Sequence, residues 1–291
     1  MHVLKSRKAW CSFLLPGLLA YILTVFFPIL QSIYYSLINW NGVSDPSFVG
    51  LKNYQDMFKD SIFWKSFFNN LEYIALVVAI QMLLGLFIAV MLTAMKRGTN
   101  LIRTLYYIPA IITTVGIAQL LRFMFSMEPL GLVNALLMAI GLGDITQSWL
   151  SNPNTSLAFL SFGEGWRFVG MYIIIFYSGL QSIDSEVIEA AKIDGAGSWK
   201  CLIYVRLPLL VPIIQLALIL SLTTALKGFD IPYLINGPSY STELVTTYMY
   251  KKAFVATRFG YGSAIACFVV MEAFIAVGAI KLIFRRRRGM E

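Results

Sequence analysis

The chain of 291 residues is 58% hydrophobic and only 13% charged. A soluble domain carries about 25% charged residues, so this composition excludes an ordinary soluble protein and indicates an integral membrane protein. The net charge of +8 does not predict nucleic-acid binding, because the basic residues cluster between alternate apolar segments.

Six apolar segments are long enough to cross a bilayer, which takes about 20 residues. We predict spans at residues 12–37, 70–95, 104–126, 157–180, 207–229 and 262–284. The first is longer than the apolar core of a signal peptide and has no clear A-x-A cleavage site, so we expect it to be retained. The predicted fold class is therefore an all-α integral membrane protein with six transmembrane helices.

Basic residues predict the orientation of these spans. Most lysines and arginines lie at the two termini and in the intervals 96–103 and 181–206. Because basic loops stay in the cytoplasm, we expect both termini and both intervals on the cytoplasmic side. The run Arg285–Arg288 is expected to anchor the last span at anionic lipid, not to bind nucleic acid.

The outer intervals carry weaker signals. Residues 48–58 have the pattern of a short amphipathic helix, and Asn236-Gly237-Pro238 is a turn signal. Within the spans, Glu272 is the strongest polar outlier and is either a packed, hydrogen-bonded acid or a proton site. Arg122 and Lys227 lie near the outer face, where we expect their side chains to snorkel to water.

The interval between residues 180 and 207 is too polar to remain in lipid. Asp184 or Ser185 is expected to cap a helix over 184–200, and Gly195 and Gly197 to supply the positive φ that ends it. Pro208 is expected to open the next span. Spacing alone leaves two interpretations open: a helix on which an external partner pushes, or an ordinary interfacial loop.

The residues of this interval resemble a known family. Glu189-Ala190-Ala191, Asp194-Gly195-Ala196 and Leu207-Pro208 are similar to the EAA motif of bacterial ABC importer permeases. Further similarities to the carbohydrate-uptake branch lie at Phe13-Leu14-Leu15-Pro16, Phe27-Pro28, Phe48-Val49-Gly50-Leu51-Lys52-Asn53-Tyr54, Gly131-Leu132-Val133-Asn134, Gly179-Leu180-Gln181, Phe229-Asp230-Ile231-Pro232-Tyr233 and Gly260-Tyr261-Gly262-Ser263-Ala264. The chain resembles the first of the two permease subunits in maltose-type and glycerol-phosphate-type systems, although Asn236-Gly237-Pro238 stands where relatives often have Gly-Gly-Pro.

The resemblance implies the type I ABC importer permease fold, with a cytoplasmic coupling helix. Residues 1–69 would form the first span and outer loop, 70–284 the permease domain with its coupling segment at 184–208, and 285–291 a basic cytoplasmic tail. The coupling residues it implies are Glu189, Ala190, Ala191, Asp194, Gly195, Ala196, Leu207 and Pro208. The partners it implies are a second permease subunit in a heterodimer, a cytoplasmic ABC ATPase dimer and an extracytoplasmic sugar-binding protein.

In this family the spans on either side of the coupling segment contribute to the central cavity. Sugars need hydrogen-bonding groups and an apolar or aromatic platform, which gives the candidate pathway residues Trp166, Arg167, Met171, Ser221, Thr224, Gly228 and Asp230. Small and hydroxyl residues also serve helix packing in lipid, so each has a purely structural alternative. An oligosaccharide is the expected cargo; glycerol phosphate would favour a cationic pocket such as one at Arg167.

The sequence contains no Gly-Lys dipeptide and hence no Walker A phosphate loop. We therefore expect no ATPase activity and no cofactor in this chain, with ATP and Mg²⁺ bound by a partner ATPase. The three cysteines and the single histidine show no metal-ligand spacing. A stand-alone secondary transporter or channel with a proton site at Glu272 is the alternative; a membrane enzyme would need a catalytic set that is not visible.

Overall fold

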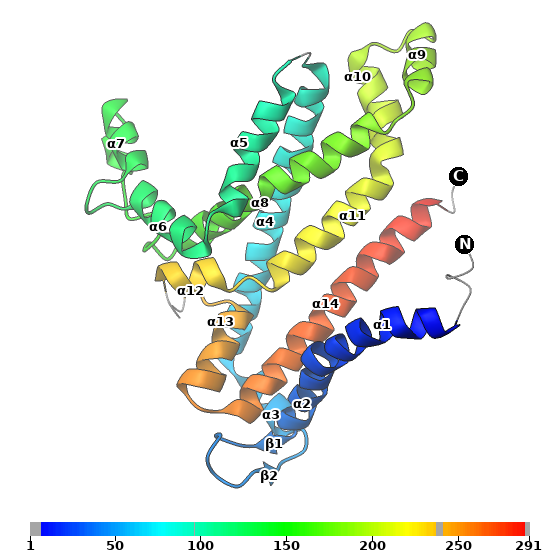
Figure 1. The fold of residues 1–291 in the computed structure, drawn as a ribbon. Helices are drawn as coiled ribbons and strands as arrows, with labels where there is room; N and C mark the ends of the chain where they lie inside the picture. Colours follow the sequence, from blue (N-terminus) through cyan, green and yellow to red (C-terminus); the bar gives the residue numbers. More distant parts are fainter. Residues whose placement is uncertain (1–6, 96, 237–240, 289–291) are drawn as a thin grey trace. The chain divides into compact units, whose positions relative to one another are not determined.

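The computed structural model describes residues 7–95, 97–236 and 241–288; the side chains of 7–12, 236 and 285–288 are not described. The predicted turn at Asn236-Gly237-Pro238 and the side chains of the basic tail therefore lie outside the described part. The chain divides into two compact units, one of Met1–Phe63 with Tyr248–Met271 and one of Trp64–Thr247 with Glu272–Glu291 (Figure 1). Each unit is considered separately below.

The first unit is built from the N-terminal helices, a short hairpin and the segment that enters the last span. Its elements are α1 (Arg7–Tyr21), η2 (Ile22–Phe26), α2 (Phe27–Ser36), β1 (Ile38–Asn39), β2 (Ser47–Phe48), α3 (Lys52–Lys59), η5 (Lys251–Val255) and the first half of α14 (Phe259–Arg288). The strands pair antiparallel, with Ile38 opposite Phe48. The predicted outer amphipathic helix is α3, which buries Asn53 and Met57 on one face.

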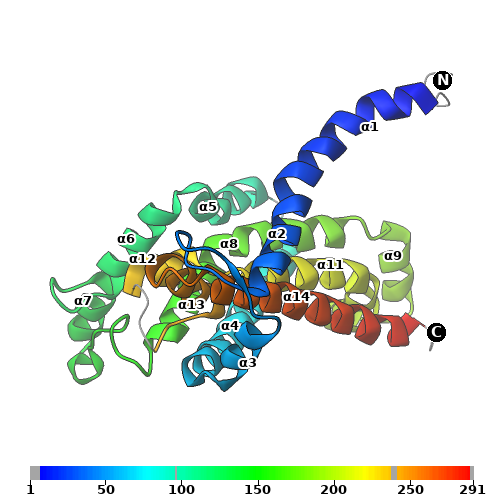
Figure 2. The same cartoon turned by 90° about the horizontal axis from the view of Figure 1, so that it is seen from below.

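The second unit holds the remaining spans and the polar segment between them. Its elements are α4 (Ser61–Ala94), α5 (Thr99–Ile111), α6 (Thr114–Phe125), α7 (Leu132–Ala139), η3 (Gly143–Ile145), α8 (Ser156–Gln181), α9 (Ser185–Ile193), α10 (Ser198–Cys201), η4 (Leu202–Arg206), α11 (Leu207–Leu226), α12 (Asp230–Asn236) and α13 (Val245–Tyr250), the first and last of which reach into the other unit. Figure 2 gives a second view of these helices.

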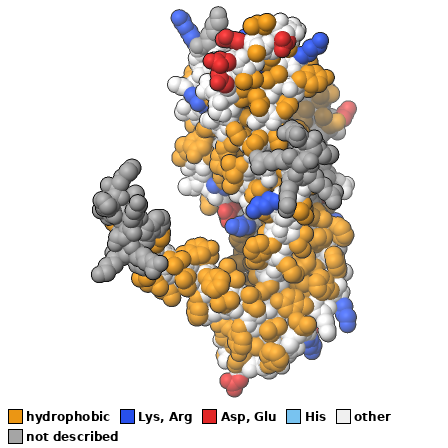
Figure 3. All heavy atoms as spheres, turned by 90° about the vertical axis from the view of Figure 1, so that its right-hand side faces the viewer, with side chains coloured by type: hydrophobic (Ala, Val, Ile, Leu, Met, Phe, Trp, Pro, Cys, Tyr) orange, Lys and Arg blue, Asp and Glu red, His pale blue; other side chains and the backbone are white. Residues whose placement is uncertain are grey.

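Among the described residues, five helices are long and apolar enough to span a membrane, or six spans if one bent pair is counted. The outward-facing side chains of these helices are largely apolar, and Figure 3 shows hydrophobic atoms over much of the face in view. Such exposure is expected of surfaces that contact lipid. Five of the six predicted spans therefore correspond to continuous apolar helices, and the remaining one, 104–126, corresponds to the bent pair of α5 and α6.

The prediction that the span at 104–126 is continuous is wrong. The helical segment begins at Thr99 and breaks at Ile112, where α5 and α6 meet at an angle of 101°. Ile112 is extended (ψ 140°), and the Thr113 hydroxyl oxygen accepts a hydrogen bond from the Gly116 N–H at 3.3 Å, which caps α6. Because the cap satisfies a main-chain donor, the chain can change direction here at low cost.

Pro208 stands in the first turn of α11, as predicted, but the helix does not begin there. It is continuous from Ser198 through Leu226, and Pro208 follows a π-turn in which the Leu207 N–H bonds the Leu202 carbonyl. Pro28 follows a similar π-turn at η2. Proline lacks the N–H of a regular helical bond and its ring crowds the carbonyl four residues earlier, so the helix widens by one residue instead of ending.

Close backbone contact joins α5 to α8 in the second unit. A Cβ added at Gly170 of α8 would lie 2.2 Å from the Tyr106 carbonyl oxygen of α5. The adjoining cluster of buried side chains includes Leu92, Tyr172 and Phe176. A glycine at this position lets the two helices approach until their main chains touch, as is common between helices in lipid.

We predict that Gly170→Ala lowers the thermal stability of the detergent-solubilised protein, by about 1–3 kcal/mol, because the two backbones must separate. Gly278→Ala is the matched control, since a Cβ at Gly278 meets nothing within 4 Å. The control should be neutral or slightly stabilising. Equal melting temperatures for the two variants would contradict the close-contact account.

Asp60 ties together three segments of the first unit. Its Oδ1 accepts the Ile62 N–H at 2.9 Å at the start of α4, and its Oδ2 accepts the hydroxyls of Tyr248 and, at 2.8 Å, Tyr261. The Lys252 ammonium lies 5.0 Å from the centre of the Tyr248 ring. Burial opposes ionisation of the carboxyl, but the three hydrogen bonds and the charge of Lys252 together outweigh it, and the pKa of Asp60 is lowered.

A lowered folded-state pKa makes stability depend on pH in one direction. The contribution of Asp60 is fully present above the unfolded-state value of about 3.9 and is lost as pH falls through the lower folded value. We therefore expect Asp60→Asn to reduce the melting temperature at pH 7 and to flatten its decline below about pH 4. The exposed Asp45 supplies the control Asp45→Asn. If the two variants had the same melting temperature at every pH, the hydrogen bonds of Asp60 would have no special role in stability.

Candidate functional site

The polar segment after α8 forms a short, capped and exposed helix. The Asp184 carboxylate accepts the Glu186 N–H at 3.1 Å, so Asp184, not Ser185, caps α9. No residue of α9 is buried. Figure 1 places α9 at the same end of the second unit as the turn between α4 and α5, so the two basic intervals of this unit lie on one side, as their charge predicted.

Gly195 ends α9 in the way the sequence suggested. Its φ is +80°, the Ala196 N–H bonds the Ala191 carbonyl at 2.9 Å, and the Gly195 N–H bonds the Lys192 carbonyl at 3.0 Å. This pair of bonds is a Schellman motif, which satisfies two carbonyls at the helix end. The turn has one fixed geometry that a side chain at Gly195 would strain.

Two expectations for this segment need correction. Gly197 does not have positive φ; at φ −62° and ψ 166° it is extended and begins α10. The single helix expected over 184–200 is therefore two helices, α9 and α10, separated by the Gly195 turn. The reason is that one left-handed residue suffices to reverse the chain, which leaves the second glycine free to start a new helix.

Several coupling candidates are accessible to a partner. Glu189, Ala190, Asp194 and Gly195 are exposed, while Ala191 and Ala196 are half-buried. Large apolar side chains beside them are also open, with Ile193 85% and Trp199 72% exposed. The segment then leads into α11, which begins with Leu207 and Pro208, and just before it the Arg206 guanidinium bonds the Thr93 hydroxyl of α4 at 3.4 Å.

The candidate pathway residues on α8 lie against different neighbours. Trp166 packs against a buried cluster with Leu160 and Ile231, and Met171 against the cluster around Tyr172. Arg167 donates to the Thr114 hydroxyl at 3.0 Å and lies 4.7 Å from the centre of the Phe168 ring.

The remaining candidates lie on α11 and in the residues that follow it, and most of them contact neighbouring groups closely. Ser221 is fully buried and donates to Gln81 of α4 at 2.5 Å, while the Thr224 hydroxyl bonds the Leu220 carbonyl at 3.0 Å. Gly228 lies against Tyr73, whose ring would be 2.6 Å from an added Cβ. These contacts give Ser221 and Gly228 clear packing roles. Asp230, by contrast, is exposed at the first turn of α12.

Sequence reasoning missed Glu164. This carboxyl lies within α8, is half-buried, and interacts electrostatically with Arg167 and Asp230. The signal was available, because an acid inside an apolar span is costly and marks a functional candidate. Glu272 itself is half-buried, and its Oε2 has no hydrogen-bond partner among the described residues.

Two polar residues organise the hairpin between α6 and α8. Buried Asn134 donates to the carbonyls of Ser126 and Gln147, at 2.9 and 3.0 Å, and accepts the Trp149 indole N–H at 2.8 Å. Arg122 does not merely snorkel to water. It donates to the carbonyls of Leu234 and Ile235, at 2.6 and 2.7 Å, and so caps the end of α12.

Comparison with known proteins agrees with this architecture. Residues 81–289 match the family described as "Binding-protein-dependent transport system inner membrane component". The chain is 33% identical to a probable ABC transporter permease protein, YurN, of Bacillus subtilis, over 89% of this chain and 90% of that protein. It is also 33% identical to the multiple sugar-binding transport system permease protein MsmF of Streptococcus mutans, over 97% and 95%.

The fold is similar to a chain in the crystal structure of a bacterial ABC transporter involved in import of the acidic polysaccharide alginate. The TM-score is 0.84 with 23% identity, and 96% of each chain is covered. At that identity the likeness concerns the fold. Together with the spans, the exposed Glu-Ala-Ala helix and the relatives, it shows that this chain belongs to the family of binding-protein-dependent transport system inner membrane components, as an ABC transporter permease.

Proposed function

We propose that this chain is one of two permease subunits of an ATP-driven importer of an oligosaccharide in a bacterial cell membrane. The observation that carries the proposal is α9, an exposed helix bearing Glu189, Ala190 and Ala191 and closed by a fixed turn. The sugar-binding transport system named for the Streptococcus relative supports a sugar as cargo. An extracytoplasmic binding protein would deliver it, as the family description implies.

In this account α9 docks on a separate cytoplasmic ATPase dimer, which binds the ATP and Mg²⁺. The small side chains of Ala190 and Ala191 permit close approach, and the Glu189 carboxylate offers a charge-assisted hydrogen bond to the partner. Asp194, Gly195 and Ala196 hold the orientation of α9. Both chain termini would lie on the same, cytoplasmic side.

Movement of α9 has a direct mechanical route into the membrane. The residues Ser198–Leu226 form one continuous helix, through α10, η4 and α11, that begins three residues after Gly195. A displacement of the turn by the ATPase would therefore move α11, which carries Ser221 and Thr224, relative to α4 and α8. Such a shift of packed helices is a common form of switching between two states.

The pathway through the second unit would pass Trp166, Arg167, Met171 and Asp230, with Glu164 added from the structure. Trp166 offers an apolar platform, while Arg167 and the two carboxyls offer donors and acceptors. Two carboxyls beside one guanidinium favour an uncharged sugar over glycerol phosphate or an acidic sugar. Family membership does not favour the alternative of a stand-alone transporter with a proton site at Glu272.

The Glu189 carboxylate is the proposed docking group. Glu189→Lys should leave the protein inserted but abolish ATP-dependent sugar uptake in vesicles containing the assembled importer, because it reverses the charge at the docking face. The exposed Glu186, three residues earlier, gives the control Glu186→Lys, which should retain most uptake. Normal uptake with Glu189→Lys would exclude the proposed role.

The two glycines after α9, Gly195 and Gly197, differ in their backbone conformation. Gly195→Ala places a side chain at φ +80° and should cost about 1 kcal/mol of turn stability, weakening copurification of the ATPase. Gly197→Ala, at φ −62°, should copurify normally. If both variants retained the ATPase equally well, the geometry of the Gly195 turn would not matter for docking.

A further inference from the structure

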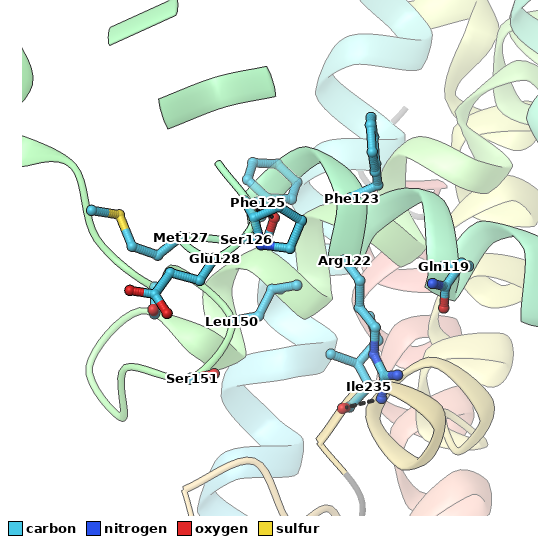
Figure 4. Close-up of a pocket in the computed structure, with 12 residues that line it drawn as sticks. Gln119, Arg122, Phe123, Phe125, Ser126, Met127, Glu128, Leu150, Ser151 and Ile235 are labelled. Carbon is cyan, nitrogen blue, oxygen red and sulfur yellow. Dashed lines mark hydrogen bonds between the residues drawn. The ribbon is translucent and has the colours of Figure 1, made fainter. Parts of the chain in front are cut away.

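A cavity of about 490 Å³ lies in the second unit, away from both α9 and the pathway candidates on α11 (Figure 4). It is lined by the second half of α6, the turns at 126–129 and 148–151, and the end of α12. Sites for small ligands have volumes of about 300–1,000 Å³, so the cavity is large enough for one to a few sugar rings. The hairpin that shapes it is held by Asn134.

One side of the cavity presents oriented hydrogen-bond donors. The Nη2 of Arg122 is fixed by its bonds to the carbonyls of Leu234 and Ile235. A guanidinium carries five N–H groups, so donors remain on Nη1 and Nε. Gln119 lies one helical turn earlier on α6, and among the described residues its amide has no hydrogen-bond partner. Little side-chain freedom would be lost when Arg122 binds a ligand.

The other side supplies acceptors and an apolar wall. In Figure 4 the Glu128 carboxylate lies across the cavity from Arg122 and Gln119, with Leu150 between them. Phe125 and Leu150 are buried behind the surface and give it an apolar floor. One cation opposite one anion leaves no net charge. Paired donors and acceptors around an apolar floor match an uncharged ring that has hydroxyls at its edge and C–H groups on its face.

The cavity adjoins the proposed pathway. Its lining residues Phe125, Leu150 and Ile235 belong to the same buried cluster against which Trp166 packs. It opens where α6 ends, at the opposite end of the α5–α6 span from the basic interval before Thr99. Under the proposed orientation this is the extracytoplasmic side, where a binding protein would release its cargo.

We infer that this cavity is an outer carbohydrate subsite, which takes a neutral sugar before it enters the pathway beside Trp166. The inference rests on the proposed function, because it assumes that the cargo is a sugar. Arg122 and Gln119 donate to its hydroxyls, Glu128 accepts from them, and the floor at Phe125 and Leu150 contacts its C–H face. The subsite selects for uncharged cargo.

The test measures protection of a cysteine placed in the cavity. Ser151→Cys is made in a variant whose three native cysteines are alanine, and maleimide modification is followed in vesicles holding the assembled importer. Maltotriose, lactose and raffinose are the probes, and ATP-dependent uptake of each is measured in parallel. Asn154→Cys, exposed in the same loop but not lining the cavity, is the matched control.

We expect an imported sugar to slow modification of Ser151→Cys and leave Asn154→Cys unchanged. At a concentration about twice its dissociation constant the rate should fall about threefold, because only the unoccupied fraction reacts. Adding Gln119→Leu should remove this protection, whereas Gln55→Leu, at another exposed glutamine, should not.

Import without protection would overturn the subsite and leave the proposed function standing. A cysteine at 151 that is unreactive before any sugar is added would also overturn the subsite, by assigning the cavity to a contact with another subunit. If no probe were imported and none gave protection, the sugar assignment and the subsite would both fail.

Discussion

Lipid offers no hydrogen bonds to the main chain, and this constraint shapes the irregular places within the described spans. At two of them, where the helix is interrupted or widened, main-chain N–H groups find another partner. Thr113 caps the second half of the broken third span, and the Leu207 N–H bonds one residue further back to accommodate Pro208. Such compensation is what permits non-helical backbone in membrane proteins.

The same constraint explains why α9 stands out. It is a helix that buries nothing, yet its two ends are fully capped, by Asp184 and by the turn at Gly195. A short helix without packing is marginal in water unless its ends are stabilised, so the caps preserve its form until a partner covers it. Beyond the turn, Ala196 and the extended Gly197 lead into the continuous helix Ser198–Leu226. The exposed helix α9 and the long helix that follows it are thus joined by a short linker that begins at the left-handed Gly195.

Close packing inside the bilayer depends on positions without a side chain. Gly170 brings α8 onto the backbone of α5, and Gly228 brings the link between α11 and α12 onto the Tyr73 ring. Polar pairs such as Ser221 with Gln81 add direction to these contacts. The fourth and fifth predicted spans are α8 and α11. Because α11 is so closely packed, a small shift of it would change the surroundings of the pathway candidates.

Local signals were the ones that sequence could supply. A cap at Asp184 or Ser185 and the positive φ of Gly195 depend on residues within one turn, so spacing predicts both, and the structure assigns the cap to Asp184. Which of two nearby glycines reverses the chain is not encoded in spacing, so Gly197 was assigned wrongly. The 101° break at Ile112 lies in an apolar run that continues on both sides, so hydropathy could not reveal it.

Contacts between distant segments could not be predicted from the sequence, because they depend on how those segments fold together. Arg122 was placed near the outer face, but its bonds to Leu234 and Ile235 depend on α12 folding back beside α6. Ser221 was proposed for the pathway from its hydroxyl alone, and only the structure shows that this hydroxyl donates a hydrogen bond to Gln81. The motif residues predict an exposed helix and turn between two spans, and the structure has both at α9, because a continuous stretch of chain forms them.

The central claim is that this permease works only as part of an ATP-driven assembly. Affinity purification of the chain from its native membrane, with identification of the proteins that accompany it, tests this most directly. The account predicts recovery of a second permease subunit together with an ATPase that carries a Walker A motif. Recovery of this chain alone, still transporting in liposomes without ATP, would contradict it.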